Sequence, residues 1–200
     1  AAGAAGGGTF VDDVFSTYLY RGNSTARSIV NGIDLAGKGG MVWTKNRASS
    51  YFSHRLFDTE RGIRKMLASN NDTAESSNSQ TLTAYNSNGF SLGTDSMVNS
   101  NNDETASWTF RKRKGFFDIQ TWSGNSTAGR QISHDLESVP GCIMVKRLDS
   151  GSSNWIVYHR SIGNNVGGAG KGPEQQALWL NSTSGQDESV EYWNNTPPTK

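Results

Sequence analysis

The sequence predicts an all-β protein built from two tandem β-sandwich units, and three observations lead to this prediction. Ser, Thr, Asn and Gly make up 83 of the 200 residues, a composition typical of many turns that join short strands. The apolar runs are short and rich in β-branched and aromatic residues. Several sequence blocks also recur in the same order roughly 100 residues apart, which is the size of one β-sandwich.

Composition also restricts the classes of function. The chain has 19 basic and 18 acidic residues, so it lacks the positive excess that duplex binding requires, and no nucleic-acid partner is expected. No apolar run approaches the roughly 18 residues of a membrane span, so no membrane insertion is expected. The single cysteine, Cys142, excludes an internal disulfide framework.

The first eight residues contain only Ala and Gly, and we interpret residues 1–8 as a flexible linker. Residues 9–114 are predicted to form the first sandwich. Asn88-Gly89 predicts a two-residue hairpin turn, and only residues 62–69 (GIRKMLAS) have a spacing typical of a helical turn. Its strands are expected at residues 15–20, 41–43, 81–85 and 106–110, and its core at Phe15, Trp43, Phe90, Trp108 and Phe110.

Residues 115–200 are predicted to form the second unit because they repeat the first. Residues 40–45 (GMVWTK) correspond to residues 141–146 (GCIMVK), and the two copies are expected to superpose. Further matches join residues 15–26 to 117–128, Asp34-Leu35 to Asp135-Leu136, and His54-Arg55 to His159-Arg160, while residues 177–180 (ALWL) correspond as a strand to the helical turn.

Residues 86–112 have no counterpart in the second copy, so the second sandwich is expected to be incomplete. A sandwich that lacks strands leaves backbone groups unpaired at a sheet edge. We therefore expect residues 1–200 to be a piece of a longer polypeptide, or neighbouring chains to complete the second unit by strand addition.

Four segments carry a resemblance to a known family: residues 29–47, 53–62, 86–99 and 138–161. They look like an uncharacterised repeat family of virion structural proteins from marine phages, notably those that infect cyanobacteria, and the resemblance covers about residues 10–193. It implies a concanavalin-A-like (lectin or laminin-G-like, jelly-roll) sandwich within a tail fibre or another appendage. It implies no catalytic residues.

Candidate chemistry in the sequence is weak. His54 and His159 are each followed by Arg and could act as bases or metal ligands, but the alternation of Trp155, Val157 and His159 favours a structural role. His134 beside Asp135 is interpreted in the same way, and Cys142 within the apolar run GCIMV is expected to behave as a small hydrophobe. Residues 163–172 (GNNVGGAGKG) lack the spacing of a phosphate loop.

The charged segments also favour structural interpretations. Residues 111–114 (RKRK) could contact an anionic surface, but an inter-repeat linker is favoured. Asp12-Asp13 and residues 99–104 lack the spacing of a calcium loop. The acidic pairs Asp12-Asp13, Asp103-Glu104 and Asp187-Glu188 are adjacent and turn-like, which does not suit glycan cleavage. No catalytic residue, metal ligand or cofactor is therefore predicted, and any ligand-binding residues are left open.

The function expected from these observations is a non-enzymatic structural and adhesion module of a phage virion, part of a tail fibre or similar appendage that contacts the host surface. The alternatives are a capsid decoration protein and a carbohydrate-binding lectin domain, for which Trp122, Tyr192 and Trp193 are candidate aromatic platforms. The expected partners are other virion proteins, further copies of the chain (a trimer in a fibre) and host surface glycan. The expected location is the virion, assembled in the host cytoplasm and then extracellular.

Overall fold

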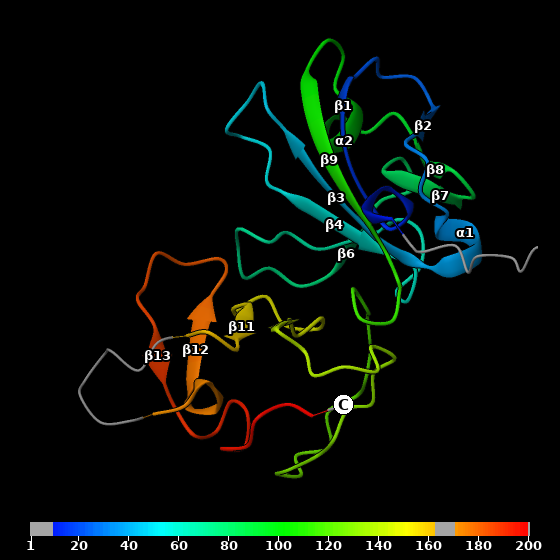
Figure 1. Ribbon diagram of the computed structural model, residues 1–200. Coiled ribbons are helices and arrows are strands. Elements are labelled where there is room, and N and C mark those ends of the chain that lie inside the picture. Colours follow the sequence, from blue (N-terminus) through cyan, green and yellow to red (C-terminus); the bar gives the residue numbers. More distant parts are fainter. Residues whose placement is uncertain (1–9, 163–170, 200) are drawn as a thin grey trace, which may run out of the picture.

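The computed structural model describes residues 10–162 and 171–199, and this part of the chain is dominated by antiparallel β-strands (Figure 1). The predicted all-β class is confirmed. Two short α-helices and two short 3-10 helices accompany the strands: η1 Val11–Asp13, α1 Leu35–Lys38, α2 Ser96–Asn99 and η2 Pro173–Gln175. The linker expected at residues 1–8 lies outside the described residues.

Two of the sheets in the first unit face each other. We call the sheet of order β1-β9-β3-β4 the front sheet and the sheet of order β2-β8-β7 the back sheet. The front sheet consists of β1 Phe15–Arg21, β9 Glu104–Arg111, β3 Gly40–Asn46 and β4 Arg55–Asp58, and the back sheet of β2 Arg27–Val30, β8 Gly89–Leu92 and β7 Leu82–Asn86. The two sheets pack face to face as a β-sandwich. The concanavalin-A-like topology stays a prediction.

The core of the first unit lies between these two sheets. Val42 and Phe57 of the front sheet and Phe90 of the back sheet are completely buried in one apolar cluster. The predicted hairpin is present between β7 and β8, but its two turn residues are Ser87 and Asn88. Gly89 instead begins β8 at φ +149°, and a Cβ there would meet the backbone oxygen of Ile29 at 2.0 Å.

The second unit contains one sheet, of order β10-β11-β12-β13. Its strands are β10 Cys142–Val145, β11 Ile156–His159, β12 Gln176–Trp179 and β13 Asp187–Glu188. In the first unit, the bridge from Leu56 to Leu67 connects β4 to a further pair of strands, β5 Lys65–Met66 and β6 Ser76–Ser77. The ribbon β3-β4-β5-β6 therefore has the same strand order as β10-β11-β12-β13.

The pairing registers show that this correspondence holds residue by residue. Met41 pairs with Asp58 as Cys142 pairs with His159, and Lys65 pairs with Ser77 as Gln176 pairs with Glu188. The pair Leu56–Leu67 corresponds in the same way to Val157–Leu178. The predicted match of residues 40–45 to residues 141–146 is therefore confirmed at the level of strand pairing.

Three expectations about the repeat are wrong in detail. Residues 62–69 form no helical turn, because Lys65 and Met66 pair with β6 as a strand and Leu67 bridges to Leu56. The register makes Trp155 the counterpart of His54, and Asp58 the counterpart of His159, so the two histidines are not equivalent. Residues 117–128, matched to β1 in sequence, form no strand.

One short motif within that last match keeps its conformation. Ser24 and Ser126 occupy the same place in GNST and have φ angles of 50° and 56°. The amide of Thr25 donates to the side-chain oxygen of Asn23, and the amide of Thr127 donates in the same way to Asn125. The shared motif GNST therefore encodes a local Asx turn in both places, whether or not a strand precedes it.

A second apolar cluster joins the two units. Trp155 is 5% exposed and packs against Met41, Leu56 and Leu67, and its indole N–H donates to the backbone oxygen of Ala68 at 2.8 Å. These contacts lie on the outer face of the front sheet, which is the face turned away from the back sheet. The outer face of a sandwich sheet is thus partly covered by the second unit.

The predicted aromatic core is accordingly correct for only one residue. Phe90 is fully buried between the sheets, whereas Phe15, Trp43, Trp108 and Phe110 are half-buried. Phe15 and Phe110 pack against each other, as do Trp43 and Trp108. Strand alternation places them on the same outer face as Met41, because Val42 and Thr109 take the inner face.

Candidate functional site

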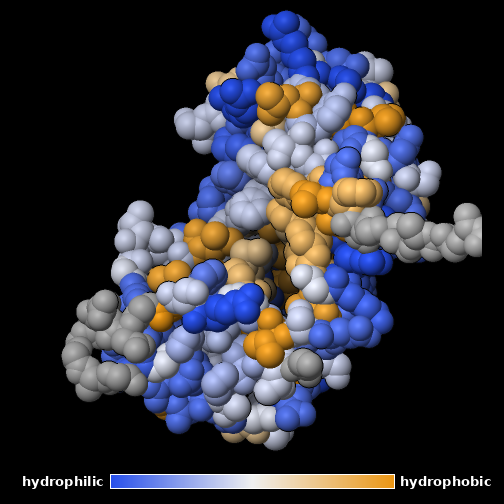
Figure 2. Space-filling view, viewed as in Figure 1, coloured by the Kyte–Doolittle hydropathy of each residue, from blue (hydrophilic) through white to orange (hydrophobic). Residues whose placement is uncertain are grey.

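A cleft of about 450 Å³ separates the outer face of the front sheet from strand β10 of the second unit. Figure 2 shows it as a hollow in the middle of the molecule, surrounded by hydrophobic side chains. A concave site with apolar walls is the usual form of a binding site in a protein. Its apolar walls consist of Met41, Trp43, Phe110, Phe116, Phe117, Leu136, Val139, Pro140, Cys142 and Met144.

Strands β3 and β10 each contribute one face to the walls of the cleft. Met41 and Trp43 alternate along β3 with Val42, so the core residue and the cleft residues take opposite faces. Phe110 of β9 supports the same wall and contacts Phe117 at a ring-centroid distance of 5.3 Å. Across the cleft, Cys142 and Met144 are exposed, and they occupy the positions of Met41 and Trp43 in the repeat.

Strand β10 also presents a backbone edge beside this cleft. The amide of Arg160 donates to the backbone oxygen of Gly141, which shows that Gly141 faces β11. In an antiparallel pair, alternate residues face opposite neighbours, so Ile143 also faces β11, while Cys142 and Met144 direct their N–H and C=O groups away. In the described part of the chain, β10 pairs with β11 alone.

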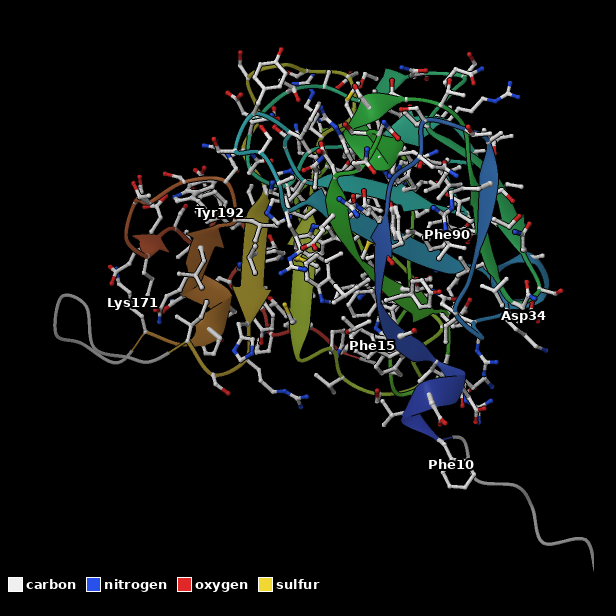
Figure 3. The ribbon with its side chains drawn as sticks, turned by 90° about the horizontal axis from the view of Figure 1, so that it is seen from above. Phe10, Phe15, Asp34, Phe90, Lys171 and Tyr192 are labelled. Atoms are coloured by element: carbon white, nitrogen blue, oxygen red, sulfur yellow. The ribbon has the colours of Figure 1, made fainter. Side chains whose placement is uncertain are left out.

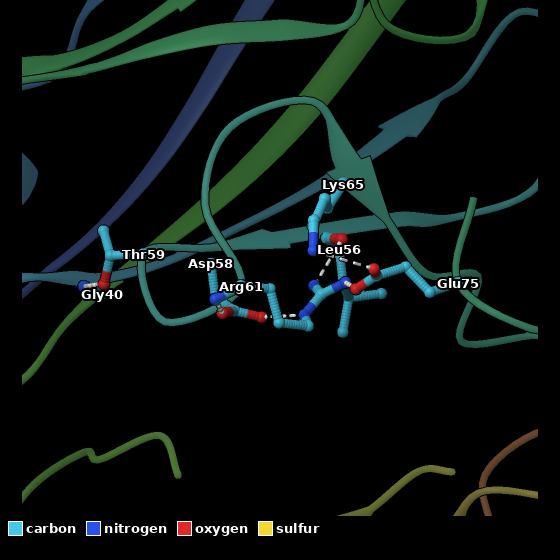
Figure 4. A network of polar contacts seen from close by, with 7 residues as sticks. All are labelled: Gly40, Leu56, Asp58, Thr59, Arg61, Lys65 and Glu75. Carbon is cyan, nitrogen blue, oxygen red and sulfur yellow. Dashed lines mark hydrogen bonds and ion pairs between the residues drawn. The ribbon is translucent and has the colours of Figure 1, made fainter. Parts of the chain in front are cut away.

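A buried ion network fixes the connection that follows β4 (Figure 4). Arg61 donates from Nε to Asp58 at 2.5 Å and from Nη1 to Glu75 at 3.1 Å, and the three side chains are between 5% and 16% exposed. The other terminal nitrogen of Arg61 donates to the backbone oxygen of Leu56. Because every charge has a partner, this network holds the chain in place and leaves no reactive group free.

The three histidines have different environments. His54 is half-buried, and its Nδ1 accepts a hydrogen bond of 2.8 Å from the indole N–H of Trp43. Burial, followed by the nearby charge of Lys45, lowers the pKa of His54 below its ordinary value. His159 is exposed at the end of β11 and lies at the rim of the cleft. His134 contacts the backbone oxygen of Thr199 through Nε2.

Comparison with known protein families assigns the chain to one family. The model of a domain of unknown function, DUF7483, matches residues 11–200, which is nearly the whole chain. The chain belongs to the DUF7483 family. No curated protein and no solved structure matches this DUF7483 domain.

Two lysines of the basic run of this DUF7483 domain, Lys112 and Lys114, are held by internal ion pairs. Lys112 lies within 2.9 Å of Glu60 and 3.1 Å of Asp118, and Lys114 pairs with Glu137. Burial by itself would lower the pKa of Lys112, but its hydrogen bonds to Glu60 and Asp118 raise it overall. These two lysines therefore pair with carboxylates of the second unit, Asp118 and Glu137, which agrees with the interpretation as an inter-repeat segment.

The acidic segments and the glycine-rich segment that were considered as metal or phosphate sites do not form a common site in the described residues. Within the described residues, no group of three or more His, Cys, Asp or Glu side chains could hold a metal ion. Asp103 accepts from Asn46, and Asp187 accepts from the hydroxyl of Tyr192. Residues 163–170 of the glycine-rich segment lie outside the described residues. No helix in the described part is long and apolar enough to cross a membrane.

Two of the three candidate aromatic platforms of this DUF7483 domain are packed against strand β12 or its neighbours. The indole N–H of Trp193 donates to the backbone oxygen of Gln176, and its ring contacts Tyr158. Tyr192, which lies beside the second-unit sheet in Figure 3, stacks edge-on against Trp179. The hydrogen bond to Asp187 raises the pKa of Tyr192 to about 12. Trp122 is 45% exposed.

Sequence reasoning missed the residues that form the cleft. The sequence patterns place Met41, Trp43 and Phe110 in repeat blocks or in the sandwich core, and Cys142 and Met144 in an ordinary apolar strand. The segment GMVWTK contained a signal for the cleft, because apolar residues occupy both faces of this strand. Met41 and Trp43 lie on one face, and Val42 lies on the other. A strand with two apolar faces is buried on both sides or borders a binding surface.

Proposed function

We propose that this domain is a non-enzymatic structural and adhesion module of a phage virion, within a tail fibre or similar appendage that contacts the host surface. One observation carries the proposal: the same four-stranded ribbon occurs twice and the copies are joined by a buried apolar contact. Elongated proteins are commonly built by stacking copies of one packed structural unit. The resemblance of residues 29–47 and 138–161 to virion proteins supports the same function.

The joint between the units supports a mechanical role. Trp155 buries its ring in the first unit and adds a hydrogen bond to Ala68, while Lys112 links Glu60 to Asp118 across the boundary. Such a joint transmits force between units better than a flexible linker does, because bending it exposes apolar surface. We propose other virion structural proteins and further copies of this chain as the partners.

Immunogold labelling of intact particles tests this proposal. Antibodies are raised against the purified domain, and labelled particles from a phage that encodes it are imaged by electron microscopy. Labels confined to tail fibres or appendages are the expected result. Labels over the capsid shell would replace this function with capsid decoration, and the absence of the protein from purified particles would overturn the virion assignment altogether.

Glycan binding is a second candidate, favoured by the exposed ring of Trp122. An exposed aromatic face can stack on the apolar face of a sugar ring. A glycan array with the wild-type domain and with Trp122→Ala tests it. Specific signals that the variant loses would support a lectin, and signals unaffected by the variant would exclude Trp122 as the platform.

A further inference from the structure

Strands β3 and β10 are equivalent in the repeat but have different neighbours. β3 lies between two strands, with β4 on one side and β9 on the other. β10 has β11 in the place of β4, and in the described residues no strand occupies the place of β9. The first unit therefore shows which neighbour is missing beside β10 among the described residues: an antiparallel strand in the register that pairs Met41 with Phe110 and Trp43 with Trp108.

The backbone of β10 is prepared for such a neighbour. Gly39 accepts a hydrogen bond from the amide of Lys112, so the β3–β9 ladder also uses the outward groups of Met41 and Trp43. The corresponding groups in β10 belong to Cys142 and Met144. In the described chain, neither residue makes a backbone hydrogen bond outside the β10–β11 pair.

The side chains around this edge match the same neighbour. An added strand would carry the residues opposite Cys142 and Met144 on their face of the sheet, directed into the cleft. In β9 these residues are Phe110 and Trp108, which pack on Met41 and Trp43. The facing wall contains Trp43, Phe110 and Phe116, so aromatic side chains entering the cleft would meet apolar partners.

We propose that the open edge of β10 binds one extended strand of a partner polypeptide, antiparallel to β10, with apolar or aromatic residues at alternate positions as in β9. The partner's backbone pairs with Cys142 and Met144, and its alternate side chains fill the cleft between the units. This inference does not depend on the virion function, because it follows from the repeat and the cleft alone.

Disulfide exchange with Cys142 tests the register directly. The probe is a synthetic peptide with the sequence of residues 104–111 (ETASWTFR) and the change Phe110→Cys, its thiol activated as a mixed disulfide with an aromatic thiol. The Cys142 thiolate attacks the peptide sulfur and releases the aromatic thiolate, so the S–S bond moves to the protein. Because partial burial raises the pKa of Cys142, the reaction is run at alkaline pH.

The matched control is the same peptide with Thr109→Cys instead. Side chains of neighbouring strand residues point to opposite faces, so only the first peptide places its sulfur beside Cys142. After correction for the rate with urea-unfolded protein, the Phe110→Cys peptide is expected to react about tenfold faster, a difference of about 1.4 kcal/mol. Equal corrected rates would overturn the proposed register and with it the binding strand.

Variants of the protein test the backbone contact. Met144→Pro removes an outward N–H without removing a β10–β11 hydrogen bond, whereas Met144→Ala removes the same side chain and keeps the N–H. The rate advantage is expected to disappear in Met144→Pro and to persist in Met144→Ala. Retention of the full advantage in a Met144→Pro protein whose unfolding midpoint matches that of Met144→Ala would contradict strand addition.

Discussion

His54 is held in its neutral form by its surroundings. Its Nδ1 accepts from the Trp43 indole, and burial lowers the pKa of the imidazole. A histidine whose pKa is lower in the folded state than in the unfolded state resists protonation while folded. The unfolded chain then binds more protons, so the free energy of unfolding falls as the pH drops through about 6.5.

We expect His54→Gln to weaken this pH dependence. The unfolding midpoint in urea is measured between about pH 8 and about pH 5.5, where most carboxylates stay ionised. The wild-type midpoint should fall toward acid more steeply than that of the variant. His159→Gln is the matched control, because His159 is exposed. Parallel pH profiles for wild type and His54→Gln would contradict the assignment.

The Arg61 network predicts an unequal cost for removing two arginines. Arg61→Ala leaves the buried carboxylate of Asp58 without its ionic partner and Glu75 with Lys65 alone, which should lower the free energy of unfolding by about 3–5 kcal/mol. Arg47→Ala breaks the exposed pair with Glu104, whose side chains are 50% and 68% exposed, and should cost no more than about 1 kcal/mol. Urea unfolding of both variants measures the difference, and similar costs would refute a structural role for the network.

Trp155 is the buried second-unit residue of the apolar cluster that joins the units. Trp155→Ala should destabilise the protein by about 3–5 kcal/mol, because it leaves a cavity among Met41, Leu56 and Leu67. Trp155→Phe keeps most of the bulk but loses the bond to Ala68, at a cost of about 1 kcal/mol for that bond. Thermal unfolding of the two variants measures both values.

Trp122→Ala is the control for this comparison, since Trp122 is 45% exposed and should change stability by about 0.5 kcal/mol or less. Hydrogen exchange adds a spatial readout. In Trp155→Ala, the amides of β10–β13 should exchange faster while those of β2, β7 and β8 keep their protection. Uniform acceleration in both units would show that Trp155 stabilises the whole fold rather than the joint.

The comparison of the two units predicts an alternating pattern of amide protection along β10. In β3 every amide has a neighbour, because β4 and β9 flank the strand. In β10 the amides of Ile143 and Val145 face β11, whereas those of Cys142 and Met144 face the open edge. Residue-resolved hydrogen exchange should show slow exchange at Ile143 and Val145 and fast exchange at Cys142 and Met144. Equal protection along β10 would mean that its edge is already covered.

Local signals in the sequence were enough to predict the fold class and the repeat. Polar turns and short β-branched runs are local signals, so the strands β3, β9 and β10 and the hairpin before Gly89 could be located without a structure. The GNST turn repeated for the same reason, since Asn23 and Asn125 each bond to an amide two residues along the chain.

The correspondence between residues of the two copies, and the faces that are covered, could not be predicted from local signals. The equivalence of His54 to Trp155 and of Asp58 to His159 depends on pairing register, which in turn depends on strands distant in sequence. Leu67 forms a β-bridge to Leu56 instead of a helical turn, because this backbone pairing outweighs a weak helical spacing. The cleft beside β10 arises because both faces of β3 are apolar. The alternation of residues along β3 shows that its outer face is apolar, but it does not show which part of the protein covers that face.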